Sequence, residues 1–245
     1  KTGEQTMSNN PPKVVDSDDD DDDDDEDEIE QLQYKVVILG DGAVGKTSIT
    51  MRFCEDYFSR QYKQTLGVDF FIKRVVLPGD VHVALQIWDI GGQTIGSKMI
   101  GNYIYGAQAV ILCYDITSYQ SFQNLEDWLE LVRKTFEKDS PPYIALVGNK
   151  TDLQHLRTVK PEKHNTFSDE GNMFSYFMSA KSGDHVNDTF YRIAADLAGI
   201  VLTKSELESS ARVVQAEIVN HAQAGPVEQA PFRDKSSGGG GCTVS

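Results

Sequence analysis

Residues 40–47 read Gly-Asp-Gly-Ala-Val-Gly-Lys-Thr. This stretch follows a short β-rich run at residues 34–39 and opens a segment with helical spacing at residues 45–54. Glycines let the backbone curl so that successive amides point at phosphate oxygens, and the N-terminus of the following helix adds partial positive charge. The order strand, loop, helix therefore predicts a phosphate-binding loop.

Two side chains of this loop are expected to carry chemistry. Lys46 can reach the β- and γ-phosphates of a nucleoside triphosphate, and the Thr47 hydroxyl can ligate Mg²⁺. The loop alone does not separate ATP from GTP, or a kinase from a switch. The other residues expected to bind the nucleotide here are Gly42, Ala43, Val44, Gly45 and Ser48.

The rest of the chain falls into three zones. Residues 1–33 are polar and acidic, residues 34–202 alternate apolar runs with glycine-rich turns and amphipathic stretches, and residues 203–245 become polar again. Apolar runs predict strands, and amphipathic spacing predicts helices. The predicted strands are residues 34–39, 70–77, 81–88, 109–114, 143–147 and 174–178, and the predicted helices are residues 45–54, 119–138, 161–171 and 186–202.

These elements predict an α/β fold. Strands buried on both faces read as continuous apolar runs, as most do here. The turn at residues 78–80 is so short that the strands on either side of it should pair antiparallel. We expect a doubly wound, mostly parallel sheet of about six strands with one antiparallel edge strand and about five helices. Ligands of such sheets bind in loops at the carboxyl ends of the strands.

Charge and composition exclude several other classes. Most of the net charge of −15 comes from one acidic run between residues 16 and 30, so the remainder offers no basic face for nucleic acid. The 3 cysteines, Cys54, Cys113 and Cys242, argue against a disulfide framework and for a reducing compartment. No apolar run has the length of a membrane span, and no signal peptide is recognisable.

The loop after the strand at residues 143–147 favours guanine. A carboxylate at Asp152 can accept hydrogen bonds from the N1–H and the exocyclic amine of guanine, and adenine lacks this arrangement of donors. A site with such a bidentate contact can reject the wrong base by about 10⁴–10⁵. Lys150 can lie along the purine face, and Asn149 can tie this loop to the phosphate loop.

The loop after the last strand adds a second contact to the base. It reads Ser179, Ala180, Lys181, and the Ala180 amide can donate to the guanine O6. Each of these signals is weak alone, because an aspartate after a strand often only caps a turn.

The loop after the strand at residues 81–88 supplies the hydrolytic residues. Asp89 ends the strand and suits a carboxylate near Mg²⁺, the Gly92 amide can sense the γ-phosphate, and Gln93 can orient an attacking water. Thr65, in a loop before a strand, can complete the Mg²⁺ shell when GTP is bound. Asp89 as a strand-end cap and Gln93 as a surface residue are the structural alternatives, and the order and spacing of the whole set favour the site.

These motifs together resemble the Ras superfamily of small GTPases over about residues 34–202. Residues 65–71, Thr-Leu-Gly-Val-Asp-Phe-Phe, and residues 114–117, Tyr-Asp-Ile-Thr, are similar to the Rab branch. Residues 89–96, with residues 103–108 and 159–164, resemble an atypical member of that branch. The resemblance implies a P-loop GTPase domain that cycles between GDP and GTP with Mg²⁺. It also implies exchange factors, activating proteins and effectors as partners, and it places Phe58 near the edge of the base.

One loop departs from the family pattern. Most Rabs read Asp-Thr-Ala-Gly-Gln-Glu here, whereas this chain has Gly91 in place of the alanine and a further glycine at Gly96. The added backbone freedom predicts a large rearrangement of residues 90–103 between nucleotide states. No arginine is obviously placed to act on the phosphates, so we expect an activating protein to supply one.

The C-terminus predicts a lipid anchor. Residues 242–245 read Cys-Thr-Val-Ser, which fits a prenylation box on Cys242, and a final serine favours farnesyl. A prenyltransferase is therefore an expected partner. A single chain gives reversible membrane binding, so we expect a monomer that exchanges between the cytoplasm and the cytosolic face of membranes.

Two other functions remain open on the sequence. A GTPase fold that holds nucleotide but barely turns over is possible because Gly91 leaves the catalytic geometry open, although Gln93 argues against it. A P-loop metabolic enzyme or ATPase is the other, and residues 149–152 disfavour it.

Overall fold

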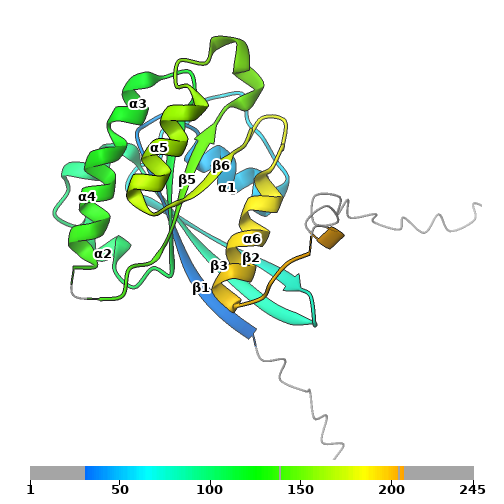
Figure 1. Ribbon diagram of the computed structural model, residues 1–245. Coiled ribbons are helices and arrows are strands. Elements are labelled where there is room, and N and C mark those ends of the chain that lie inside the picture. The colour runs from blue at the N-terminus through cyan, green and yellow to red at the C-terminus, as the bar shows by residue number, and fades with distance from the viewer. Residues whose placement is uncertain (1–30, 138, 204, 207–245) are drawn as a thin grey trace, which may run out of the picture. The chain divides into compact units, whose positions relative to one another are not determined.

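Six β-strands form one sheet in the order β2-β3-β1-β4-β5-β6 in the computed structural model, which describes residues 31–137, 139–203 and 205–206 (Figure 1). β2 and β3 pair antiparallel, and every other neighbouring pair is parallel. The strands are β1 (Gln31–Leu39), β2 (Val68–Leu77), β3 (Val81–Ile90), β4 (Ala109–Asp115), β5 (Tyr143–Asn149) and β6 (Phe174–Phe177).

Helices cover both faces of this sheet. They are α1 (Lys46–Glu55), α2 (Ile100–Ile104), α3 (Tyr119–Gln123), α4 (Leu125–Thr135), α5 (Pro161–Gly171) and α6 (Val186–Ala198), with 3₁₀ helices η1 (Gly92–Gly96) and η2 (Thr151–Leu156). Figure 1 shows α3 and α4 on one side of the strands and α6 on the other. None of the helices among the described residues is both long and apolar enough to cross a bilayer.

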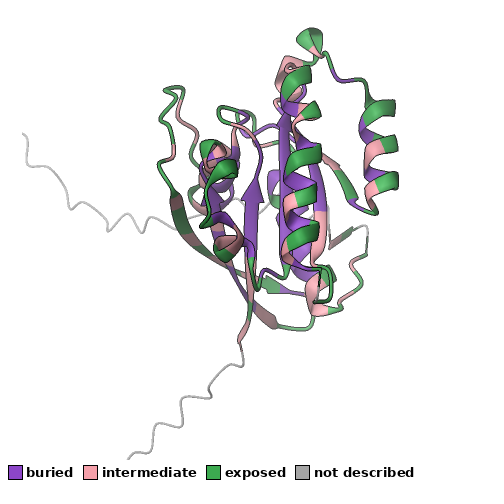
Figure 2. Ribbon diagram, turned by 90° about the vertical axis from the view of Figure 1, so that its left-hand side faces the viewer, coloured by how far each residue is buried: buried purple, intermediate pink, exposed green. Residues whose placement is uncertain are grey.

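The core follows from the apolar runs of the central strands. Every residue of β4 is buried, whereas β2 at the edge alternates exposed and half-buried side chains. One core cluster joins the sheet to α1 and α6, where the rings of Phe53 and Phe190 stack with their centroids 4.2 Å apart. A second cluster, which includes the fully buried Trp128 of α4, packs on the opposite face. Figure 2 shows the resulting layer of buried strands between helices with exposed outer surfaces.

The α/β fold, the mostly parallel six-stranded sheet and the antiparallel edge strand are confirmed. The helix predicted at residues 119–138 is in fact two, α3 and α4, which meet at Asn124, and α4 ends at Thr135. The helix predicted at residues 186–202 ends at Ala198, because Gly199 adopts a left-handed conformation with φ of 70°. The short helices η1, α2 and η2 were not predicted, since each is too brief to show a period.

Two cysteines behave as core residues. Cys113 is fully buried in β4, and Cys54 is half-buried at the end of α1. Burial raises the pKa of the Cys113 thiol to about 12 and that of Cys54 to about 11, so both stay protonated at neutral pH. The predicted zone boundaries at residues 33 and 202 stay predictions, although β1 already begins at Gln31.

Candidate functional site

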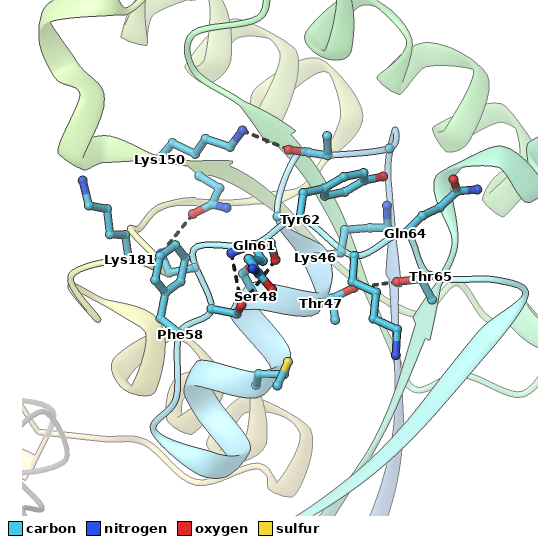
Figure 3. Close-up of a pocket in the computed structure, with 18 of the residues that line it drawn as sticks. Lys46, Thr47, Ser48, Phe58, Gln61, Tyr62, Gln64, Thr65, Lys150 and Lys181 are labelled. Carbon is cyan, nitrogen blue, oxygen red and sulfur yellow. Dashed lines mark hydrogen bonds between the residues drawn. The ribbon is translucent and has the colours of Figure 1, made fainter.

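A cavity of about 660 Å³ opens at the carboxyl ends of the strands, where the sequence placed the site. Five stretches that are distant in the chain line it, and Figure 3 shows Lys150 and Lys181 on one side of it and Gln64 and Thr65 on the other. The lining includes residues 42–43, 45–48, 57–65, 92–93, 149–150 and 180–181.

The phosphate loop joins β1 to α1, and two of its glycines, Gly40 and Gly45, are required by shape. Gly40 has φ of 137°, and a Cβ there would lie 2.1 Å from the carbonyl oxygen of Cys113 in β4. Gly45 has φ of 103°, and a Cβ there would lie 2.3 Å from the Asn149 amide nitrogen. Only glycine combines a left-handed backbone with so close an approach. Ala43 is also left-handed, with φ of 62°.

The ammonium of Lys46 lies inside this loop. It donates to the carbonyl oxygens of Gly40 at 2.8 Å and Asp41 at 2.7 Å, and the residue is only 5% exposed. Burial lowers the pKa of Lys46, while the nearby carboxylates of Asp89 and Asp41 oppose that shift. A phosphate bound in the loop would favour the charged ammonium, so this side chain is prepared for an anionic ligand.

Thr47, Thr65 and Asp89, the three predicted metal-site residues, come together. The Thr47 hydroxyl lies 2.7 Å from the Thr65 hydroxyl and donates to Asp89 Oδ2. Asp89 is fully buried, and its Oδ1 has no hydrogen-bond partner among the described residues. Burial raises the pKa of this carboxyl, whereas a divalent cation nearby would favour its ionised form.

Oxygen donors of this kind fit Mg²⁺. Two hydroxyls and one carboxylate leave room for water and phosphate oxygens, which Mg²⁺ usually keeps as ligands. No group of three histidine, cysteine, aspartate or glutamate side chains that could hold a metal occurs in the described part of the chain. The orphaned Asp89 Oδ1 is therefore the observation that favours an ion at this place.

Asn149 and Lys150 fasten the predicted base loop to the phosphate loop. The Asn149 side chain donates to the Val44 carbonyl at 2.8 Å and accepts from the Ala180 amide at 3.1 Å. Lys150 donates to the Ala43 carbonyl at 2.9 Å and forms an ion pair with Asp115 at 2.7 Å. The predicted link between the two loops is therefore present in the structure.

The carboxylate of Asp152 is held at the mouth of the cavity. Ser179 donates its hydroxyl proton to Asp152 Oδ1 at 2.7 Å, and the Lys181 ammonium lies 3.4 Å from Oδ2. The loop at residues 179–181 is itself fixed by Arg52, which donates to the carbonyl oxygens of Ala180 and Lys181, each at 3.0 Å. These contacts fix the Asp152 carboxylate beside the cavity, whereas the Ala180 amide donates to the Asn149 side chain.

Gln93 and Gly92 lie at the other end of the cavity. The Gln93 side chain is exposed and accepts a hydrogen bond from the Gln64 amide. Gly92 packs against the phosphate loop, where a Cβ would lie 2.2 Å from the Gly42 nitrogen. Gly92 therefore lies against the loop that is expected to hold the phosphates, whereas Gln93 borders the cavity and is held by Gln64.

Ser48 and Phe58 also line the cavity, as predicted. Phe58 is half-buried and packs on the core cluster beside α1 and α6. Cys242, the predicted lipidation site, lies outside the described residues.

Sequence reasoning missed several residues that hold the site together. Asp115 pairs with Lys150 and lies opposite Asn149 in the β4–β5 register, a neighbourhood that the sequence alone does not give. Arg52 and Gln64 had no local signal, since their partners lie far away in the chain. Arg60 also lines the cavity, although no arginine was expected there.

Comparison with known proteins agrees with this geometry. The profile of the Ras family matches residues 35–199. The chain is 40% identical over 212 residues to the Ras-related protein Rab-28 of Caenorhabditis elegans, and the match covers 86% of both sequences. The phosphate loop, the base loop and the two loops at Thr65 and Gly92 lie inside the matched region. This chain belongs to the Ras family of small GTPases, which hydrolyse GTP, and within that family to the Rab branch.

Proposed function

We propose that this GTPase is a membrane-trafficking switch whose GTP-bound form recruits effectors and whose slow hydrolysis of GTP releases them. The observation that carries the proposal is the meeting of two separate loops at the phosphate loop. Thr65 reaches Thr47 from one loop, and Gly92 packs on Gly42 from the other. Both loops can therefore be held by a γ-phosphate and relax when it is lost.

The chain's residues divide the catalytic work. Lys46 neutralises charge on the β- and γ-phosphates, and the Gly92 amide faces the γ-phosphate. Gln93 orients the attacking water with its carboxamide. Thr47 and Thr65 would hold Mg²⁺ with help from Asp89, and the ion would neutralise charge on the phosphate oxygens. Without an added arginine we expect intrinsic hydrolysis at a rate on the order of 10⁻⁴–10⁻³ s⁻¹.

The base is selected at the other end of the cavity. Asp152 accepts two hydrogen bonds from guanine, and Lys150 lies along the purine face. The Ala180 amide donates to the guanine O6 once it gives up its hydrogen bond to Asn149 Oδ1. Phe58 closes the edge of the base site. This division supports guanine over adenine, because an adenine base would leave the oriented carboxylate without its donors.

An exposed apolar surface supports effector binding. Phe70 in β2 and Trp88 in β3 form an edge-on ring contact with centroids 5.6 Å apart, and the Tyr103 ring lies 6.4 Å from Trp88. Leu66, in the loop that carries Thr65, is 81% exposed. An effector that covers this surface would contact both nucleotide-sensitive loops and so distinguish the two states.

The C-terminal prenylation box and the nucleotide site together suggest three further partners. A prenyltransferase modifies Cys242, and the single lipid lets the monomer exchange between cytoplasm and membrane. An exchange factor loads GTP, and an activating protein supplies an arginine. Arg60→Ala tests that last point, since an unchanged intrinsic rate is expected if the arginine comes from the partner.

Two measurements test the proposal. In competition against a fluorescent guanine nucleotide, GTP and GDP should displace the probe and ATP should not. In single-turnover assays, Gln93→Leu should slow hydrolysis at least tenfold without weakening GTP binding. Displacement by ATP would point instead to an ATPase. If the unmodified protein and Gln93→Leu both hydrolysed GTP at the same negligible rate, the protein would be a binding module that does not turn over GTP.

A further inference from the structure

The side chain of Gln93 needs a partner to fix its direction. Its main chain is held within η1, where the Thr94 amide donates to the Gly91 carbonyl at 3.0 Å and the Ser97 amide donates to the Thr94 carbonyl at 2.7 Å. Its side chain, by contrast, is exposed. An exposed glutamine samples many rotamers, and holding one of them costs conformational entropy. A glutamine that orients an attacking water therefore requires something that restrains its carboxamide.

Gln64 supplies that restraint from the other nucleotide-sensitive loop. Among the described residues, the only hydrogen bond of the Gln93 side chain is the one that its Oε1 accepts from Gln64 Nε2. Gln64 directly precedes Thr65, whose hydroxyl lies 2.7 Å from that of Thr47 at the predicted metal site. Gln64 and Thr65 lie on the same side of the cavity (Figure 3). The hydrogen bond to Gln93 therefore connects the two loops beside that site.

The direction of this hydrogen bond is compatible with the role proposed for Gln93. A carboxamide oxygen has two lone pairs, so Oε1 can accept from Gln64 and still accept one hydrogen bond from the attacking water. A donor on Oε1 also fixes which way round the carboxamide lies, because its NH₂ group must then point to the opposite side. Gln64 can therefore restrain Gln93 and leave one lone pair for the water.

We propose that Gln64 is a positioning residue that orients the carboxamide of Gln93 when the loop at residues 57–65 closes over the nucleotide. The inference rests on the proposed function, in which Gln93 orients the attacking water. Gln64 moves with Thr65, its neighbour in the chain, so its amide reaches Gln93 in the state in which Thr65 reaches Thr47. Hydrolysis is thereby coupled to closure of this loop.

The test compares Gln64→Met with the unmodified full-length protein. Methionine is as unbranched and flexible as glutamine but has no hydrogen-bond donor. Single-turnover hydrolysis of GTP should slow about three- to tenfold, in line with the loss of one hydrogen bond. Release of GDP and of a non-hydrolysable GTP analogue in Mg²⁺ should change less than twofold, because the amide of Gln64 bonds Gln93. Gln123→Met, at an exposed position of α3, is the matched control and should leave all three rates unchanged.

A double substitution separates positioning of Gln93 from other effects of the loop. In a Gln93→Leu background, Gln64→Met should cause no further slowing of hydrolysis, because the carboxamide on which Gln64 acts is gone. Undiminished slowing in that background would overturn the proposal, as would a larger change in the release of either nucleotide. Unchanged or faster hydrolysis in Gln64→Met alone would overturn it too, and a faster rate would show that Gln64 draws Gln93 away from the water. Failure of the proposed function itself differs, since the unmodified protein and Gln93→Leu would then hydrolyse GTP at the same rate.

Discussion

The carboxylate of Asp152 shows how single side chains are prepared before a ligand arrives. A free aspartate at a loop would sample several rotamers and pay an entropic cost on binding. Here Ser179 and Lys181 hold its two oxygens, and Arg52 holds the loop from which Ser179 extends. Preorganised acceptors of this kind turn hydrogen bonds into discrimination between bases.

Asp152→Ala should weaken GTP binding by about 10²–10⁴-fold, because two hydrogen bonds to a charged group are lost. ITP, which lacks the exocyclic amine, should bind the unmodified protein more weakly than GTP. Asp152→Ala should no longer distinguish GTP from ITP. Equilibrium titration with both nucleotides checks this, with the exposed Asp169 in α5 replaced by alanine as control. Retained discrimination in Asp152→Ala would assign the base contact to another group.

His164 in α5 is a buried residue that makes stability depend on pH. Its Nδ1 lies 2.9 Å from the Tyr114 hydroxyl and its Nε2 lies 2.8 Å from the Ser175 hydroxyl, so the ring links α5 to β4 and β6. Burial, with a smaller effect from Arg157, lowers the pKa of His164 to about 4. The unfolded chain binds this proton more readily than the folded one, so folding stability is complete above about pH 6.5.

As the pH falls from 6.5 to 4, the protein should therefore lose about 3 kcal/mol of stability through this one group. Urea unfolding at several pH values measures the slope. His164→Gln should reduce this dependence of the unfolding free energy on pH. Replacement of the exposed His155 in η2 serves as control and should leave the dependence unchanged. An unchanged slope in His164→Gln would place the acid sensitivity elsewhere.

At the scale of the elements, the junction of α3 and α4 is bonded to the phosphate loop. Asn124 donates to Asp41 Oδ2 at 2.6 Å, and the Trp128 indole donates to Oδ1 at 3.2 Å. Asp41 belongs to the phosphate loop, and its main-chain carbonyl accepts a hydrogen bond from the Lys46 ammonium. The start of α4 therefore braces the phosphate loop from outside the cavity.

Asn124→Ala should speed release of GDP and of a GTP analogue by a similar factor, about tenfold, because one hydrogen bond to a charged group is lost. The phosphate loop serves both nucleotides, so their ratio should not change. Stopped-flow release of both nucleotides measures this. Gln123→Ala, at an exposed position of α3, is the matched control. A selective effect on one nucleotide would contradict a role through the phosphate loop.

For the molecule as a whole, the nucleotide site and the proposed anchor belong to different parts of the sequence. The residues that line the cavity lie between Gly42 and Lys181, whereas Cys242 lies close to the C-terminus. The state of the C-terminal thiol should therefore not alter nucleotide chemistry.

Cys242→Ser should abolish membrane association in a cell fractionation and leave GTP release and hydrolysis unchanged. Ser245→Leu should retain the anchor but favour a geranylgeranyl group in place of farnesyl, which mass spectrometry distinguishes. Membrane association that survives in Cys242→Ser would show that the lipid is not the anchor.

The local parts of the site were predictable from sequence. The phosphate loop and the turn at residues 78–80 are encoded by glycines and spacing within a few residues. Backbone conformation and apolar periodicity depend on neighbours along the chain, so a single sequence reveals them. Asn149 was also predicted to tie two loops together, because parallel strands bring their carboxyl ends to one edge.

The long-range hydrogen bonds that hold the site residues in place depend on the tertiary structure. Asp41 and Asn124 are 83 positions apart, and Arg52 and Ala180 are 128 apart. Their pairing depends on which segments the sheet order places together. From the sequence, the glycine at position 91 indicated only added backbone freedom. The lack of room beside it for a side chain depends on how closely the segment at Thr65 approaches in the fold, and no local pattern records that distance.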